Sequence, residues 1–175
     1  MGRALAIVVA LAASTAGAKS PSLASLQGEV TVVAFWATSC PPCRKELPMV
    51  EALRTALAKD AKVRVVAVSI DLPGDEARAK KMARDLGLKA PLLVEQSVYE
   101  ELFGYTDEAS VPRLAVIDRK RAGLERVGMR AGEDAEAFVR EVTAAVASVK
   151  AAAADKARAV EPPTPMWRPL APAHQ

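Results

Sequence analysis

Runs of consecutive apolar residues alternate along this chain with stretches in which apolar residues recur every three or four positions. The first pattern predicts strands buried on both faces, and the second predicts helices with one buried face. Strands are predicted at 29–37, 62–70, 91–94, 113–118 and 123–128, and helices at 41–57, 75–86, 97–103 and 133–150. This order predicts an α/β fold, with a central mixed sheet covered by helices on both sides.

The two ends of the chain differ in composition from its centre. Arg3 is followed by an apolar run and by small residues that end at Ala18, which is the layout of a secretory signal peptide. We therefore expect residues 1–18 to be a signal peptide and the protein to be periplasmic, or alternatively to be membrane-anchored through this segment if it is not cleaved. Residues 19–150 are expected to form one domain. The Ala- and Pro-rich residues 151–175 predict a frayed helix and a disordered tail.

The chain has only two cysteines, Cys40 and Cys43, and they lie three positions apart. A disulfide across so short a loop constrains the unfolded chain little, so we expect a chemical role rather than a stabilising one. The pair lies where a predicted strand ends and a predicted helix begins, and the unpaired N–H groups and dipole of a helix start favour an anion. Cys40 is therefore predicted to be the attacking thiolate and Cys43 the resolving cysteine.

Two other classes of site are disfavoured. The formal net charge is only +3 and aromatic residues are few, so we expect no nucleic-acid partner and interpret the basic run 119–121 as a solvated turn. A zinc site built on the cysteine pair would need two further ligands, and the only histidine, His174, lies in the predicted tail. We therefore expect no metal and no cofactor.

The segment FWATSCPPCRKELP, residues 35–48, resembles the active-site segment of the TlpA/ResA-like thioredoxin proteins, which are membrane-anchored or periplasmic reductases. The resemblance covers about residues 23–146. It implies a thioredoxin fold with an inserted helix and strand between Asp71 and Val94. It also implies that Pro48 kinks the active-site helix.

The same resemblance implies a substrate-binding surface. Val111-Pro112 matches the cis-proline dipeptide that faces the cysteines in this fold and holds the substrate backbone, with an ordinary trans proline as the alternative. Together with Trp36, Pro41 and Pro42, these two residues are the predicted substrate-binding residues.

Glu46 is the third predicted catalytic residue, because it matches a glutamate of the ResA-like branch that is implicated in tuning the thiols. A carboxylate near both sulfurs would disfavour the thiolate and could relay protons. The alternative is a surface residue with Arg44 and Lys45 as solvated neighbours. Ala34 stands where thioredoxin itself carries a buried aspartate.

Three further positions depart from the usual pattern. Ser39 replaces the Trp common before the first cysteine, and Arg113 replaces the Thr common after the cis-proline. The loop before Val111 is longer and contains residues 107–109, two of which are acidic. We expect these acidic groups on the rim of the substrate groove, where they would favour a basic substrate segment.

The dipeptide between the cysteines bears on the direction of electron flow. Two prolines supply no charge and few donors to stabilise a thiolate, which favours a reductant. The expected function is therefore an exported thiol-disulfide oxidoreductase, monomeric, that reduces disulfides of extracytoplasmic proteins, with apocytochrome c as one candidate substrate. A membrane thiol donor is the expected partner, because a reductant in an oxidising compartment must be recharged.

Two alternatives stay open. One is a thiol oxidase or isomerase of the same fold, and the other is a thioredoxin-fold binding module without turnover. A peroxidase is disfavoured, because Cys40 lacks the Pro-x-x-x-Thr-x-x-Cys setting of peroxiredoxins.

Overall fold

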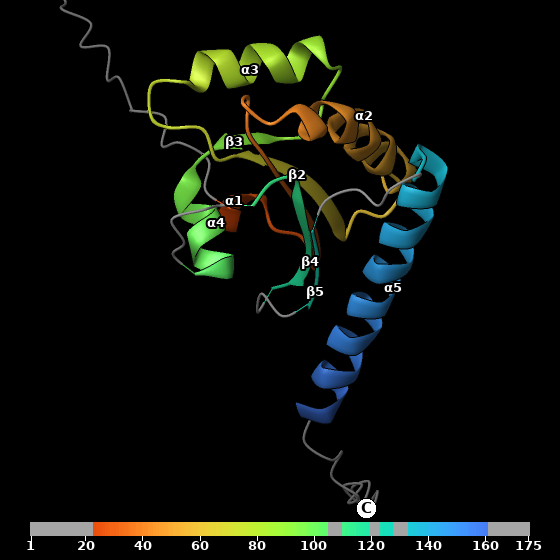
Figure 1. The fold of residues 1–175 in the computed structure, drawn as a ribbon. Helices are drawn as coiled ribbons and strands as arrows, with labels where there is room; N and C mark the ends of the chain where they lie inside the picture. The colour runs from red at the N-terminus through yellow and green to blue at the C-terminus, as the bar shows by residue number, and fades with distance from the viewer. Residues whose placement is uncertain (1–22, 105–109, 120–122, 128–132, 161–175) are drawn as a thin grey trace, which may run out of the picture.

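A five-stranded mixed sheet lies at the centre of the fold in this computed structural model (Figure 1). The structure describes residues 23–104, 110–119, 123–127 and 133–160. The strands are β1 (Val30–Trp36), β2 (Val63–Ser69), β3 (Leu92–Val94), β4 (Arg113–Asp118) and β5 (Gly123–Val127). The helices are α1 (Leu23–Leu26), α2 (Pro41–Ala56), α3 (Glu76–Asp85), α4 (Gln96–Phe103) and α5 (Ala135–Val160).

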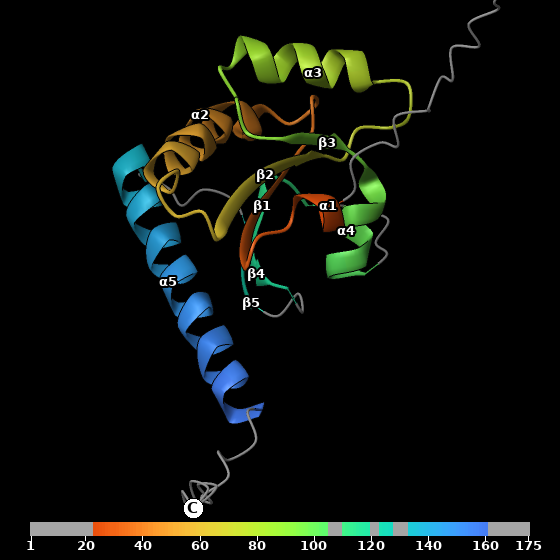
Figure 2. The same ribbon diagram turned by 180° about the vertical axis from the view of Figure 1, so that it is seen from behind.

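The strand order is β3-β2-β1-β4-β5. Strand β1 is parallel to β2 and antiparallel to β4, and β4 and β5 form the predicted antiparallel pair. Helices α2, α3 and α5 lie on one side of the sheet, whereas α1 and α4 lie on the other (Figures 1 and 2). The predicted mixed sheet covered on both sides is therefore confirmed, and α3 and β3 form the expected insertion.

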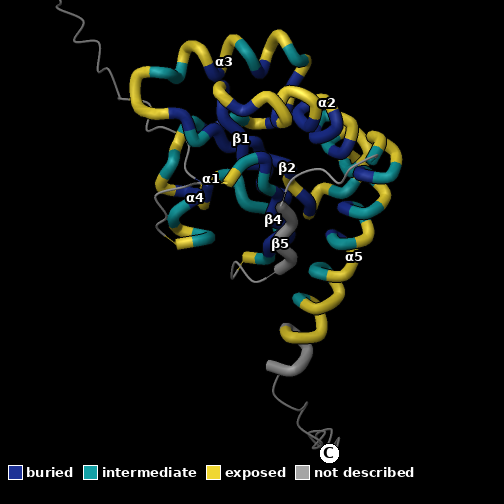
Figure 3. The backbone as a smooth tube through the Cα atoms, in the orientation of Figure 1, coloured by how far each residue is buried: buried dark blue, intermediate teal, exposed yellow. Residues whose placement is uncertain are grey.

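Strand β1 is buried along its whole length, because it is central and both of its faces are covered (Figure 3). Its side chains alternate between two cores. Ala34 and Trp36 join the core beneath α2 and α5, while Val33 and Phe35 join the core beneath α1 and α4. The end of β1 is therefore held on both sides, and it leads directly into the cysteine pair.

The structure differs from the predicted elements at two places. Helix α1 was not predicted from the sequence, and α5 continues to Val160 instead of ending near Lys150. Alanines at 151–154 are strong helix formers, so the helix extends without needing a buried face there. The first part of the predicted tail is therefore helical.

The predicted signal peptide, residues 1–18, and the chain beyond Val160, including His174, lie outside the described residues. The same holds for the acidic loop residues 107–109 and for most of the basic run 119–121. Among the helices that the structure describes, none has the length and apolar character needed to cross a membrane.

Candidate active site

Cys40 and Cys43 lie at the start of α2, directly after the central strand. Cys40 is the N-cap residue, with an extended backbone at φ −98° and ψ 102°, and Pro41 is the first helical residue. Pro41 and Pro42 occupy positions whose N–H groups would have no partner inside the helix, so the prolines cost the helix nothing there. Cys40 and Cys43 form a disulfide, so the structure represents the oxidised state of the pair.

The sulfur of Cys40 is the one that the helix start can stabilise. The N–H of Cys43 donates a hydrogen bond to Sγ of Cys40, with an N···S distance of 3.2 Å. After reduction, this donor and the helix dipole favour negative charge on that sulfur. Cys40 is 8% exposed and Cys43 is 1% exposed. The more accessible residue of the pair is thus also the one at the helix N-terminus.

The peptide bond between Val111 and Pro112 is cis, as the resemblance implied, so the trans alternative is wrong. The carbonyl oxygen of Val111 lies 3.6 Å from Sγ of Cys40, although the two residues are 71 positions apart in the sequence. The antiparallel pairing of β1 with β4 brings them together. The backbone at the cis-proline therefore borders the Cys40 sulfur.

Glu46 is buried on the inward face of α2, with 4% of its surface exposed. The alternative that Glu46 is a surface residue is therefore wrong. With Cys43, Trp36 and Pro112, Glu46 lines a cavity of about 10 Å³. A space of this size is close to the minimum that one water molecule needs. Glu46 thus lines the same small cavity as the resolving cysteine.

The predicted substrate-binding residues divide into two groups. Pro41 and Pro42 are exposed, and Val111 is half-buried beside Cys40. Trp36, by contrast, is 1% exposed, so the prediction that its side chain contacts substrate is wrong. The alternation of side chains along β1 directs Trp36 into the core under α2, to the small cavity that Cys43 also lines. Pro112 is buried at the same cavity.

Sequence analysis missed a buried cluster that holds the loop before Cys40. The carboxylate of Asp71 accepts hydrogen bonds from the N–H of Thr38 at 3.0 and 3.1 Å and from the Thr38 hydroxyl at 2.6 Å. It also accepts one from the hydroxyl of Ser69 at 2.5 Å, and Arg78 lies 3.7 Å away. Thr38 and Asp71 follow two adjacent parallel strands, and that placement is the signal that could have indicated their contact.

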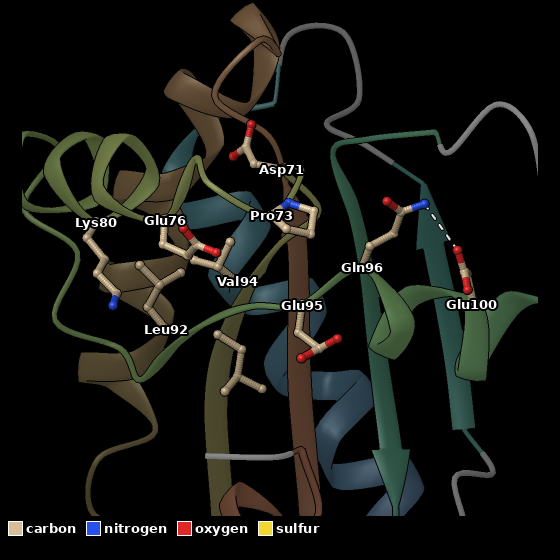
Figure 4. Close-up of a pocket in the computed structure, with 10 residues that line it drawn as sticks. Asp71, Pro73, Glu76, Lys80, Leu92, Val94, Glu95, Gln96 and Glu100 are labelled. Carbon is tan, nitrogen blue, oxygen red and sulfur yellow. Dashed lines mark hydrogen bonds between the residues drawn. The ribbon is translucent and has the colours of Figure 1, made fainter. Parts of the chain in front are cut away.

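A larger cavity of about 540 Å³ lies along β3, beside α3 and the start of α4 (Figure 4). Four carboxyl groups and one ammonium group line it, from Asp71, Glu76, Glu95, Glu100 and Lys80. The carboxylates have partners within the chain: Glu76 accepts from the N–H of Gly74, and Glu100 accepts from the amide of Gln96. Within the described ranges, no three His, Cys, Asp or Glu side chains gather in a way that could hold a metal ion.

The mixed sheet, the disulfide at a helix start and the adjacent cis-proline define a thioredoxin-fold protein with a dithiol-disulfide site. The sequence matches the AhpC/TSA family over residues 6–122, and the chain belongs to this family.

Individual relatives agree with this assignment. Thiol-disulfide oxidoreductase ResA of Bacillus thuringiensis is 25% identical over 126 residues, which are 71% of this chain and 70% of ResA. Thioredoxin-like protein YneN of Bacillus subtilis is 32% identical over 83 residues, or 47% of this chain and 48% of YneN.

A solved structure of a thiol:disulfide interchange protein of the thioredoxin family, from Chlorobium tepidum, aligns with a TM-score of 0.55 at 27% identity. The alignment covers 70% of this chain and 83% of that protein. The resemblance to TlpA/ResA-like proteins is therefore confirmed, and the protein is a thiol-disulfide oxidoreductase of the thioredoxin fold.

Proposed function

We propose that this protein is exported from the cytoplasm and that, as a monomer, it reduces disulfides of extracytoplasmic proteins. Apocytochrome c is a candidate substrate. The observation that carries the direction is the burial of Glu46 beside Cys43. A buried carboxylate disfavours a neighbouring thiolate by repulsion. Because a strong oxidant of this fold depends on a stabilised reduced form, a site that destabilises thiolate favours a reductant.

The dipeptide between the cysteines supports the same direction. The side chains of Pro41 and Pro42 carry no charge and no hydrogen-bond donor, so neither adds to the stabilisation of a thiolate at Cys40. The stabilisation that remains comes from the helix start and the N–H of Cys43. This stabilisation supports Cys40 as the nucleophile.

The reaction is a two-step exchange of sulfur bonds. In the reduced protein, the Cys40 thiolate attacks one sulfur of the substrate disulfide, a mixed disulfide forms, and the first substrate thiolate leaves. The Cys43 thiolate then attacks the Cys40 sulfur, closes the Cys40–Cys43 disulfide and releases the second substrate thiolate. Each released thiolate takes up one proton. In this proposal Glu46, which lines the same small cavity as Cys43, accepts the proton that Cys43 gives up before its attack.

Each turnover leaves the protein in the oxidised state that the structure represents. Two electrons and two protons must then come from another dithiol. In an oxidising compartment this donor has to draw on the cytoplasm, so we propose a membrane thiol donor as the partner.

The reduction potential tests the direction of the reaction. Equilibration with dithiothreitol redox buffers should give a value near or below that of thioredoxin, about −270 mV. A value close to that of DsbA, about −120 mV, would instead support the oxidase alternative. Reduction of insulin with dithiothreitol as donor, compared between the wild type and Cys40→Ser, separates an enzyme from a binding module. Equal rates for the two proteins would contradict turnover at this site.

Export is tested separately. The first residues of the chain, fused to a reporter enzyme that is active only outside the cytoplasm, should give activity in a bacterial host. A fusion with Arg3 and the apolar run deleted is the control. Equal reporter activity of both fusions would contradict export.

A further inference from the structure

One buried hydroxyl group holds the chain on both sides of the cis-proline. Oη of Tyr99 accepts a hydrogen bond from the N–H of Ser110 at 3.1 Å and another from Nη1 of Arg113 at 2.7 Å. It donates to the carbonyl oxygen of Ser110 at 3.4 Å. A phenol has one donor and two acceptor sites, so its hydrogen-bonding capacity is fully used. All three bonds go to residues that flank Val111-Pro112.

Arg113 approaches this hydroxyl from the side of the sheet that faces away from Cys43 and Glu46. In the β1–β4 pairing Arg113 lies opposite Phe35, which belongs to the core beneath α1 and α4. Its guanidinium carbon lies 3.5 Å from the ring centre of Phe103 and 5.4 Å from that of Tyr99. A guanidinium above aromatic rings is a favourable cation–π arrangement. Arg113 therefore contacts α4 on the face of the sheet opposite to Cys43, and it acts on the loop through Tyr99 of that helix.

The position of the Tyr99 hydroxyl is fixed by aromatic packing. Tyr99 is 1% exposed, and its ring lies edge-on to Phe35 at a centroid distance of 5.3 Å. It also contacts Phe103 at 4.9 Å. Phe35 belongs to β1, the strand that ends just before Cys40. The position of the hydroxyl is thus fixed relative to β1, the same strand that positions Cys40.

We propose that Tyr99 is a positioning residue for disulfide exchange: it fixes the cis-proline loop at the distance from Cys40 that a protein substrate requires. The loop carries the Val111 carbonyl, which lies 3.6 Å from Sγ of Cys40. Loss of the hydroxyl removes the acceptor that the N–H of Ser110 and the guanidinium of Arg113 share, so the bonds that tie the two ends of the loop to α4 are lost. The inference rests on the proposed function, because only a polypeptide substrate uses this backbone.

Substrate size is the readout that distinguishes this role from a merely structural one. A small aromatic disulfide such as 5,5′-dithiobis(2-nitrobenzoate) needs only the Cys40 sulfur, whereas insulin must also lie along the loop. In Tyr99→Phe, which keeps the ring, kcat/KM for insulin should fall about tenfold, mainly through a higher KM. The rate with the small disulfide should stay within about twofold of the wild type.

Hydrogen exchange provides a second measurement on the same variant. The Ser110 amide should be protected in the wild type and should lose that protection in Tyr99→Phe. Thr143→Val, which removes a hydroxyl from α5, is the matched control and should behave as wild type in all three assays. Arg113→Thr should slow insulin reduction in the wild-type background, but much less in Tyr99→Phe, because Arg113 acts through that hydroxyl. If Tyr99→Phe does not fold, Arg113→Thr alone carries the same comparison between the two substrates.

Two results would overturn the inference. One is insulin kinetics of Tyr99→Phe equal to wild type, and the other is an equal loss with insulin and with the small disulfide. Failure of the proposed function looks different: the wild type itself would then not reduce insulin while still reacting with the small disulfide.

Discussion

The carboxylate of Asp71 binds both hydrogen-bond donors of Thr38, two residues before Cys40. Because Thr38 follows β1 and Asp71 follows β2, this contact joins the ends of two parallel strands. The carbonyl oxygen of Thr38 in turn accepts a hydrogen bond from Arg44 of α2 at 3.5 Å. The loop that presents the nucleophile is therefore fixed from β2 and from its own helix.

Asp71→Ala should lower the free energy of unfolding by about 1–3 kcal/mol, because it leaves the buried N–H of Thr38 without an acceptor. It should also slow the reaction with small and with protein disulfides to the same extent, since the nucleophile itself is misplaced. Urea unfolding and stopped-flow thiol exchange measure the two effects. Thr38→Val keeps the N–H bond and should show a smaller loss in both. Wild-type exchange rates in a destabilised Asp71→Ala would contradict the positioning role.

The order of attack predicts which variant traps substrate. Cys43→Ala should accumulate a mixed disulfide between Cys40 and the substrate, because no second thiolate is available to release it. Non-reducing gels and mass spectrometry of the adducts measure this, with Cys40→Ser as the control that should form none. Adducts of equal amount through Cys43 in Cys40→Ser would reverse the assignment of the two cysteines.

Glu46→Gln should lower the pKa of the Cys40 thiol, because it removes a carboxylate from the space beside the pair. The thiolate absorbance of the reduced protein, followed against pH, measures the change. Glu51→Gln removes a carboxylate from a later turn of the same helix and should leave the titration as in the wild type. An unchanged titration in Glu46→Gln would remove Glu46 from the mechanism.

The carboxyl group of Glu51 should make a pH-dependent contribution to the free energy of unfolding. Burial raises its pKa, but hydrogen bonds from Arg54 and from the N–H of Lys89 outweigh that effect, and the pKa of Glu51 is lowered. A carboxyl with a lowered folded-state pKa stabilises the fold above its unfolded value, about 4.3, and loses that contribution as the pH falls through the folded value.

Glu51→Gln should therefore destabilise the protein by about 1 kcal/mol at neutral pH, and the difference from wild type should shrink below about pH 4. Urea unfolding at several pH values measures it. A difference that stays constant into the acid range would show that the charge of Glu51 is not responsible.

Much of the framework follows from local pattern. The apolar runs that form β1 and β2 have no polar face, so they were predicted to be central strands. The cysteine pair between a strand and a helix indicated thiol-disulfide exchange. The cis bond before Pro112 followed from resemblance alone. These features depend on neighbours in the sequence, or on a motif that specifies them.

Tertiary packing decides what local pattern left open or missed. Glu46 was predicted as a catalytic residue from resemblance, with a surface position as the alternative because its sequence neighbours are basic. Its place on the buried face of α2 excludes that alternative, and no local pattern records this burial. The burial of Trp36 depends on which face of the sheet the even-numbered side chains of β1 point to. The contacts of Tyr99 with Ser110 and of Asp71 with Thr38 join side chains to backbone across 11 and 33 positions. Such bonds leave no periodic signal in the sequence.

The length of α5 has a practical consequence. Its last turns run past the sheet, away from the end of the fold where α2 begins (Figure 1). Residues 151, 152 and 154–156 are exposed. A fluorophore or a solid support coupled at this end would leave the dithiol open to solution. An immobilised Cys43→Ala form of the protein could therefore capture disulfide-bearing clients from a complex mixture while its reactive end stays unobstructed.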